Sequence, residues 1–336
     1  MFLSVLNNDH PDLEKQTAPL KVLFVSSGNL KNFDVAPFIK VQGESLKQLD
    51  ISVDYFKVSG KGFSGYLSNV KTLRKYIKSN NFDLVHAHFT LSAWVVVLGR
   101  PKIPIVLSLM GTDAYGRVEN INKRKPNLNS FTLLTLLIQP FVKSIISKST
   151  NIEKYVWMKK KSHLLPNGVN MRIFSPSTHS YRKELGLKEN KKYALFLGNK
   201  RDPRKNFSLF ETTREKLEQE GIEIIAPYPV PHEDVVKYLN TVDVLVMCSL
   251  EEGSPNVVKE AMACNCKGVF TDVGDVRFLI ENTDGYQVTE FDSLDLSNKI
   301  IEMSNMPRCN GRKRLENLGL ELNQVAVKLK NIYLTK

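Results

Sequence analysis

The sequence predicts an α/β protein made of two halves, each with a parallel β-sheet and crossover helices, that face one another across a cleft. Three observations lead to this prediction. Short apolar runs alternate with helical patterns, the alternation begins again in the second half, and a turn-rich run, Pro166–Asn170, separates the two series. The length of 336 residues suits two domains. The formal net charge of +12 indicates an anionic partner: nucleic acid, anionic lipid or a phosphorylated substrate.

The first half contains four strand-like runs joined by helical patterns. The strands are expected at residues 21–26, 51–58, 83–86 and 103–109, and the helices at 37–49 and 68–78. Ligands of parallel sheets bind at the carboxyl ends of the strands. The residues that follow Ser26, His86 and Leu109 are therefore the first candidates for a site.

The second half repeats this alternation. Strands are expected at 193–197, 222–226, 242–248 and 266–271, and helices at 207–220, 232–240, 255–264 and 311–333. These runs predict an N-terminal domain over residues 1–170 and a C-terminal domain over residues 171–310. Residues 311–336 are expected to form a C-terminal helix that packs back toward the first domain.

Cysteines and apolar runs indicate a cytoplasmic protein. The four cysteines contain no Cys-x-x-Cys pair, which argues against zinc and fits a reducing compartment. The N-terminus lacks the features of a signal peptide. The longest apolar stretch, Phe131–Ile146, is interrupted by Gln139, Pro140 and Lys143 and is too short to span a membrane. It predicts a helix followed by a strand.

The segment Val244–Val273 carries the most chemical information. A buried strand leads into a loop with Glu252, and Ser254 and Pro255 suit the N-cap and first position of a helix that ends at Asn265. The free amides of residues 254–257 would form a cradle for an anion or a hydroxyl group. Glu252 and Glu260 could accept hydrogen bonds from sugar hydroxyls. The alternative is that both are solvated surface residues.

Five segments, in order along the chain, resemble motifs of the retaining GT-B glycosyltransferases of family 4. They are Asp83–His88; Leu165–Asn170 with Phe174 and Pro176; Phe196–Gly198 with Arg201, Lys205 and Asn206; Glu252–Cys264; and Thr271–Asp275. The resemblance covers residues 20–335. It implies the GT-B fold, in which two Rossmann-like domains enclose a donor cleft, the first domain binding the acceptor and the second the nucleotide sugar.

The resemblance also implies roles for individual residues. Glu252 would contact the donor sugar near the reacting carbon, and Glu260 the nucleotide ribose. Lys205 and an arginine would neutralise the diphosphate; we favour Arg201, with Arg204 as the alternative. The other residues expected to bind the UDP or GDP sugar are Gly253, Ser254, Pro255, Asn256 and Val257. No Asp-x-Asp motif is present, so we expect a site that works without metal or cofactor.

Candidate residues in the first half are less certain in role. His88 could act in catalysis as a proton relay, or be a core histidine. Gly28 and Asn29 would form a loop that approaches the phosphate or the acceptor, unless they make a simple turn. Asp113 could contact the acceptor or cap a helix. Met110 stands where the family often has histidine, which leaves the acceptor chemistry open.

The leading hypothesis is a glycosyltransferase of bacterial surface polysaccharide or glycolipid synthesis that uses a glycan or lipid-linked acceptor. A sugar-nucleotide epimerase and a non-catalytic GT-B partner subunit are the alternatives. No nucleic-acid-binding motif is present. The basic runs Lys123–Lys125 and Lys159–Lys161 indicate peripheral association with the anionic inner face of the membrane; the alternative is that these are solvated loop lysines.

Overall fold

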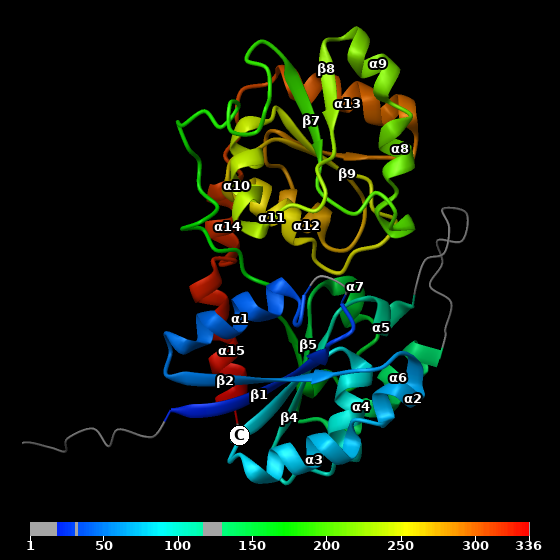
Figure 1. Cartoon of the computed structure of the whole chain (residues 1–336), viewed down its shortest axis with the longest axis vertical. Helices are drawn as coiled ribbons and strands as arrows, with labels where there is room; N and C mark the ends of the chain where they lie inside the picture. Colours follow the sequence, from blue (N-terminus) through cyan, green and yellow to red (C-terminus); the bar gives the residue numbers. More distant parts are fainter. Residues whose placement is uncertain (1–18, 31–32, 117–129, 336) are drawn as a thin grey trace, which may run out of the picture.

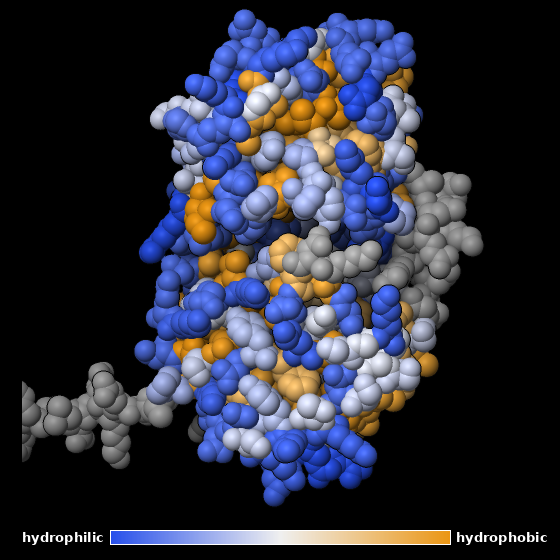
Figure 2. All heavy atoms as spheres, viewed as in Figure 1, coloured by the Kyte–Doolittle hydropathy of each residue, from blue (hydrophilic) through white to orange (hydrophobic). Residues whose placement is uncertain are grey.

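The computed structural model describes residues 19–30, 33–116 and 130–335. Two lobes lie end to end, each with a single parallel sheet covered by helices (Figure 1). The space-filling view in Figure 2 shows a hollow at the level where the lobes meet. This architecture confirms the predicted α/β class with two sheets.

The first lobe contains a six-stranded sheet with the order β2-β1-β3-β4-β5-β6. Its strands are β1 (Leu20–Ser27), β2 (Ile51–Val58), β3 (Leu84–His88), β4 (Ile105–Leu109), β5 (Ser144–Ser147) and β6 (Ser162–Leu164). Its helices are α1 (Pro37–Lys47), α2 (Gly62–Leu67), α3 (Val70–Ser79), α4 (Thr90–Leu98), α5 (Thr112–Tyr115), α6 (Ser130–Ile138) and α7 (Thr150–Glu153), with the 3₁₀ turns η1 (Gln139–Phe141) and η2 (Lys159–Lys161).

The second lobe contains a five-stranded sheet with the order β11-β10-β9-β7-β8. Its strands are β7 (Lys192–Phe196), β8 (Ile222–Ile225), β9 (Val244–Met247), β10 (Gly268–Thr271) and β11 (Tyr286–Thr289). The helices that follow residue 200 are α8 (Phe207–Glu211), α9 (Arg214–Gln219), α10 (His232–Thr241), α11 (Asn256–Ala263), α12 (Val276–Ile280), α13 (Ser293–Asn305), α14 (Gly311–Leu318) and α15 (Leu322–Leu334), with the 3₁₀ turn η3 (Pro203–Lys205).

The central strands are buried on both faces, which explains their apolar sequences. Every residue of β3, β4, β5 and β9 is buried. All pairings within the two sheets are parallel, so crossover helices cover both faces. The carboxyl ends of the strands are therefore the edges left for a site.

Three predicted elements differ from the structure. β3 extends to His88, two residues beyond the predicted end. The helix expected over 207–220 is divided into α8 and α9. The helix expected over 311–333 is divided by Gly319, whose φ of +64° ends α14 in the left-handed conformation.

The division at Gly319 lets the end of the chain return to the first lobe. α14 packs against α11, whereas α15 packs against α1, and Figure 1 shows α15 running along the first sheet. The Tyr333 hydroxyl lies 2.6 Å from His86 Nδ1. The Nζ atom of Lys330 donates to the Leu49 carbonyl oxygen at 2.9 Å. The last helix thus belongs to the core of the first lobe.

The apolar stretch Phe131–Ile146 forms α6, η1 and the start of β5, as the helix-then-strand prediction requires. Within the described residues, none of the helices has the length and apolar character needed to cross a membrane.

We expect Tyr333→Phe to lower the free energy of unfolding by about 1–3 kcal/mol, because it leaves the buried His86 Nδ1 without its partner. Tyr55→Phe is the matched control, since the Tyr55 hydroxyl is buried and no group in the described parts of the chain pairs with it. Chemical denaturation measures both. Equal unfolding free energies for the two variants would contradict this account.

Candidate active site

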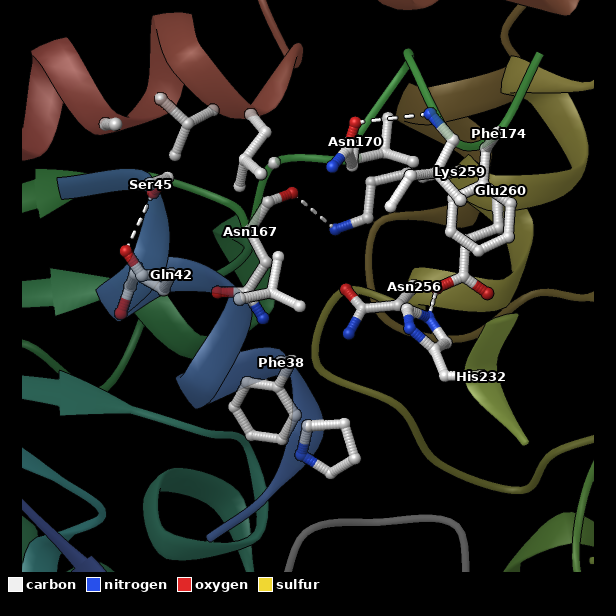
Figure 3. Close-up of a pocket in the computed structure, with 18 of the residues that line it drawn as sticks. Phe38, Gln42, Ser45, Asn167, Asn170, Phe174, His232, Asn256, Lys259 and Glu260 are labelled. Carbon is white, nitrogen blue, oxygen red and sulfur yellow. Dashed lines mark hydrogen bonds and ion pairs between the residues drawn. The ribbon is translucent and has the colours of Figure 1, made fainter. Parts of the chain in front are cut away.

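Two adjoining pockets lie between the lobes at the carboxyl edges of the strands. The cleft pocket, of about 410 Å³, is lined by Met110, Tyr115 and Lys148 from the first lobe and by the loops after β7 and β9 from the second. The hinge pocket, of about 240 Å³, lies between α1, α15 and the start of α11 (Figure 3). Asn167 and Asn256 line both pockets, so they form one continuous site.

Glu252 lies in the cleft pocket, in the loop after β9. Its Oε1 atom accepts hydrogen bonds from Lys205 Nζ at 2.6 Å and from Ser249 Oγ at 2.8 Å. Tyr115 of the first lobe donates its hydroxyl hydrogen to the Glu252 carbonyl oxygen at 2.7 Å. The predicted sugar-binding glutamate and the predicted phosphate-binding lysine therefore form an ion pair at the boundary of the lobes.

Glu260 lies in the hinge pocket and pairs with a residue that the sequence analysis missed. His232 Nε2 is 2.9 Å from Glu260 Oε1, and the His232 ring packs on Phe174 with centroids 5.3 Å apart. Figure 3 shows the pair on the wall opposite Phe38 and Gln42 of α1. The hydrogen bond to Glu260 raises the pKa of His232. His232 starts the helix after β8, so the strand-end rule could have found it.

The start of α11 differs by one residue from the prediction. Pro255, not Ser254, occupies the N-cap position, and Ser254 caps no amide there. Instead Ser254 Oγ accepts a hydrogen bond from Lys259 Nζ at 3.0 Å, and the same ammonium donates to the Asn167 carbonyl oxygen at 2.8 Å. Burial lowers the pKa of Lys259 to about 8. Lys259 therefore ties the inter-lobe junction to α11.

The far end of α11 follows the prediction. Asn265 has a φ of +53°, the left-handed conformation expected to end this helix. Its side-chain Oδ1 accepts the backbone amide of Arg312 at 2.9 Å, which joins the end of α11 to the start of α14.

Of the two candidate arginines, the structure favours Arg204. Arg204 lines the cleft pocket together with Lys205, whereas the exposed Arg201 does not line it. Asp202 accepts two hydrogen bonds from the Arg204 guanidinium, at 3.1 and 2.7 Å, and orients it. Both arginines are exposed, and Arg204 lies in η3 next to Lys205, which places it at the rim of the cleft pocket.

Gly253 allows the two lobes to touch. A Cβ atom at this position would lie 2.7 Å from the Met110 carbonyl oxygen. Any other residue would push the lobes apart. Met110, which stands at the family's usual histidine, therefore lines the cleft and contacts the loop that carries Glu252.

Two predicted residues of the first lobe lie behind the cleft pocket and do not line it. His88 is buried, stacked on His86 with ring centroids 4.2 Å apart, and burial lowers its pKa so that the ring is neutral. Neither His88 ring nitrogen has a hydrogen-bond partner among the described residues.

Asp113 is fully buried, and its carboxylate accepts hydrogen bonds from the backbone amides of Thr90, Met110 and Gly111. Asp113 thus holds the Met110 loop in place, and its contact with the acceptor stays a prediction.

Gly28 and Asn29 also lie outside the two pockets. The Asn29 side chain donates to the Gly60 carbonyl oxygen at 2.8 Å and accepts the Gly60 amide at 2.9 Å. A Cβ atom on Gly28 would lie 2.9 Å from the Cβ of Lys57. Packing against β2 therefore requires the small residue, and the approach of this loop to a ligand stays a prediction.

Lys148 and Tyr115 line the cleft pocket and were missed by the sequence analysis. Lys148 directly follows β5, and Tyr115 ends the short helix after β4. Ligands of parallel sheets bind at the carboxyl ends of strands. Applied to the strand predicted within Phe131–Ile146, this principle would have indicated Lys148.

No group of three His, Cys, Asp or Glu side chains in the described residues could hold a metal ion. The charged groups that line the cleft pocket are an arginine, two lysines and two glutamates: Arg204, Lys148, Lys205, Glu251 and Glu252. This set is suited to binding anionic and hydroxyl groups.

Two parallel-sheet lobes with a ligand cleft at their strand ends define the GT-B class of glycosyltransferase folds. The family comparison places the chain within this class. Residues 188–305 match the model "Glycosyl transferases group 1", and residues 42–173 match "Glycosyltransferase Family 4". The protein belongs to the GT-B glycosyltransferases of family 4.

Relatives agree with this assignment. A Bacillus subtilis glycosyltransferase, TuaC, named for teichuronic acid biosynthesis, is 28% identical over 220 residues, which span 59% of this chain and 55% of the relative. An uncharacterised glycosyltransferase of Methanocaldococcus jannaschii is 23% identical over 79% of this chain and 77% of its own length. This chain thus aligns with little more than half of the Bacillus protein.

Solved structures share the fold. A sucrose-phosphate synthase of Thermosynechococcus elongatus has a TM-score of 0.77 at 18% identity, covering 94% of this chain and 98% of that one. HepE of Anabaena in complex with UDP-glucose has a TM-score of 0.64 at 16% identity, covering 93% and 100%.

The His232–Glu260 pair predicts a pH-dependent contribution to stability. Because the folded-state pKa of His232 is raised, this contribution is fully present below the unfolded-state value of about 6.5 and is lost as the pH rises through the folded-state pKa. The effect is small, since the His232 side chain is 44% exposed.

We therefore expect wild type to lose its stability advantage over His232→Gln as the pH rises above the unfolded-state value of about 6.5. Denaturant unfolding at several pH values measures this. His179→Gln is the control, since it removes a more exposed histidine–glutamate pair. A constant difference between wild type and His232→Gln would refute the charged pair.

Proposed function

We propose that the protein is a retaining glycosyltransferase that moves a hexosyl group from a UDP or GDP sugar to a hydroxyl acceptor. The observation that carries this proposal is the cleft pocket, where Glu252 and Lys205 pair beside Arg204 at the start of α11. Family membership supports the reaction class and its retention of configuration. The UDP-glucose complex of HepE supports a nucleotide-sugar donor.

The two pockets divide the donor between them. The nucleoside would lie toward the hinge pocket, where Glu260 offers a carboxylate to the ribose hydroxyls. The diphosphate would lie at Lys205 and Arg204, and the sugar at Glu252. The leaving diphosphate gains negative charge as the glycosidic bond breaks, and fixed cations stabilise that charge. This is why we expect metal-independent turnover.

His88 is proposed as a catalytic proton relay. Because the ring is buried and does not line the cleft pocket, this role requires that the substrate reach the ring behind the pocket wall. Among the described residues, the groups of the first lobe at the pocket wall are Phe38, Met110, Thr112, Tyr115 and Lys148. Two alternatives remain open to test, a sugar-nucleotide epimerase and a non-catalytic partner subunit. Met110 in place of histidine favours the second, whereas Glu252, Glu260 and Lys205 favour an enzyme.

Release of nucleoside diphosphate from a panel of UDP and GDP sugars, with and without added hydroxyl acceptors, tests the proposal. We expect Lys205→Met to lower kcat about 100-fold, because Lys205 acts where charge develops in the transition state. Lys200→Met is the control, since Lys200 lies over the Phe207 ring in the same loop. Excess chelator should leave the wild-type rate unchanged.

Several results would count against this model. Complete loss of activity in chelator, restored by magnesium or manganese, would contradict metal independence. Epimer formation without an acceptor would favour the epimerase. Normal turnover by Lys205→Met, combined with a lower melting temperature, would make Lys205 structural.

We also propose peripheral association with anionic membrane at the inner face, in keeping with an acceptor for surface polysaccharide or glycolipid synthesis. Four large apolar side chains of the first lobe, Leu133, Leu137, Phe141 and Trp157, are each more than half exposed. Trp157 Nε1 donates to the Leu136 carbonyl oxygen at 2.9 Å, which joins Trp157 to α6.

A basic run lies beside this apolar surface. Lys161 Nζ donates to the Val142 carbonyl oxygen at 2.8 Å, so Lys159–Lys161 packs next to the end of η1. Attraction to anionic lipid is worth about 1 kcal/mol per nearby lysine, screened by salt. In this run the exposed Lys160 would contribute most, because the ammonium groups of Lys159 and Lys161 pair with Glu153 and with carbonyl oxygens. The other basic run, Lys123–Lys125, lies outside the described residues.

Sedimentation with phosphatidylglycerol and phosphatidylcholine vesicles tests membrane binding. We expect salt-sensitive binding to the anionic vesicles, reduced about tenfold or more by Phe141→Ser with Trp157→Ser. Leu294→Ser is the control, because it removes an exposed apolar side chain from the second lobe. Equal binding to neutral vesicles, or none at low salt, would refute the proposal.

A further inference from the structure

We propose that Lys148 is a recognition site for an anionic substituent, a carboxylate or a phosphate, on one of the two substrates that meet in the cleft pocket. This inference rests on the proposed glycosyl transfer and adds to it a substrate class. The substituent is distinct from the donor diphosphate, which we assign to Lys205 and Arg204 on the second lobe.

The first observation is that Lys148 is buried without a partner. Its side chain is 2% exposed, and the Nζ atom has no hydrogen-bond acceptor within the described ranges of the chain. Burial lowers its pKa to about 7, with the nearby charge of Lys259 adding to the effect. A buried ammonium group without a partner costs several kcal/mol, so the position needs an explanation other than stability.

The second observation is the contrast with Lys259, the other buried lysine of the same region. The Lys259 ammonium donates to the Asn167 carbonyl oxygen and to Ser254 Oγ, at 2.8 and 3.0 Å. The hydrogen bonds of the Lys259 ammonium are thus supplied by the protein itself. Lys148 has the same burial and lacks such acceptors in the described structure, so its acceptor is expected to come from outside.

The third observation is its position. Lys148 follows β5 at the carboxyl edge of the first sheet and lines the cleft pocket with Glu252 and Gly253. Ser147 Oγ, the neighbouring hydroxyl, is also buried and unpaired among the described residues. Lys148 is therefore an unpaired polar group on the wall where a substrate must lie to react near Glu252, and Ser147 lies behind it in β5.

These observations select the chemistry of the ligand. A carboxylate or phosphate oxygen accepts charge-assisted hydrogen bonds from an ammonium group, whereas a neutral hydroxyl restores much less of its lost hydration. The flexible four-carbon stem of lysine lets the ammonium turn toward the pocket as the anion arrives. The anion could be the carboxylate of a uronic acid donor or a phosphate carried by the acceptor.

The test compares Lys148→Met with Lys267→Met. Methionine keeps the unbranched shape of lysine and removes the charge. Lys267 is buried away from the cleft, and its ammonium donates to the carbonyl oxygens of Ser304 and Met306. We expect Lys267→Met to lower the melting temperature and Lys148→Met to leave it equal or higher, since only Lys267 has partners to lose.

Calorimetry then separates the two sources of the anion. The donor arm compares UDP-glucuronic acid with UDP-glucose, and GDP-mannuronic acid with GDP-mannose. The acceptor arm compares glucose 1-phosphate with glucose, each in the presence of UDP or GDP. We expect one arm to show a preference for the anionic probe of about tenfold or more in wild type, and Lys148→Met to abolish it.

The outcomes are distinct. Loss of preference in the donor arm assigns Lys148 to a uronic acid sugar, and loss in the acceptor arm assigns it to an acceptor phosphate. Equal weakening of acidic and neutral probes, unchanged binding of all probes, or a melting temperature that falls as in Lys267→Met would overturn the proposal. If wild type binds no nucleotide sugar, the proposed function fails, and binding of glucose 1-phosphate alone still decides the role of Lys148.

Discussion

The close approach of two backbones at Gly253 is the constraint on which the site depends. A side chain there would strike the Met110 carbonyl, and a Cβ atom on Gly274 would lie 2.6 Å from the Gly253 carbonyl oxygen. Asn151 of the first lobe donates to the Gly274 carbonyl oxygen at 2.7 Å. Because these loops touch, the carboxyl edges of two separate sheets become one cleft, and Glu252 is held against the first lobe.

Buried and half-buried cations tie together the segments around this contact. Lys259 joins the junction to α11, and Arg312 donates to the carbonyl oxygens of Met171 and Phe174, which follow that junction. Lys161 similarly satisfies carbonyl oxygens at the end of η1. Part of the basic excess of +12 is therefore used inside the protein. The net charge therefore overstates how many cations are available to an anionic partner. Lys148 is informative because its ammonium group has no acceptor among the described residues, whereas the nearby Lys259 ammonium has two.

One wall of the hinge pocket is formed by the last helix, α15. α15 fills the groove beside α1 and lines the hinge pocket, and α14 stays on the second lobe. Gly319 makes this crossing possible, because its left-handed conformation ends one helix and redirects the chain. The nucleoside side of the proposed site is therefore built from segments more than 280 residues apart, such as Phe38 and Leu329.

The sequence by itself determined the α/β class, the strands other than β6 and β11, the helix after Glu252 and its end at Asn265, because hydrophobic period and cap chemistry act over a few residues. Only the tertiary structure decided which side chains meet. It placed Arg204 at the cleft pocket, enclosed His88 and Asp113, and brought His232 to Glu260 and Lys148 to the cleft. These outcomes depend on how two lobes pack, and contacts between distant segments leave no local pattern in the chain.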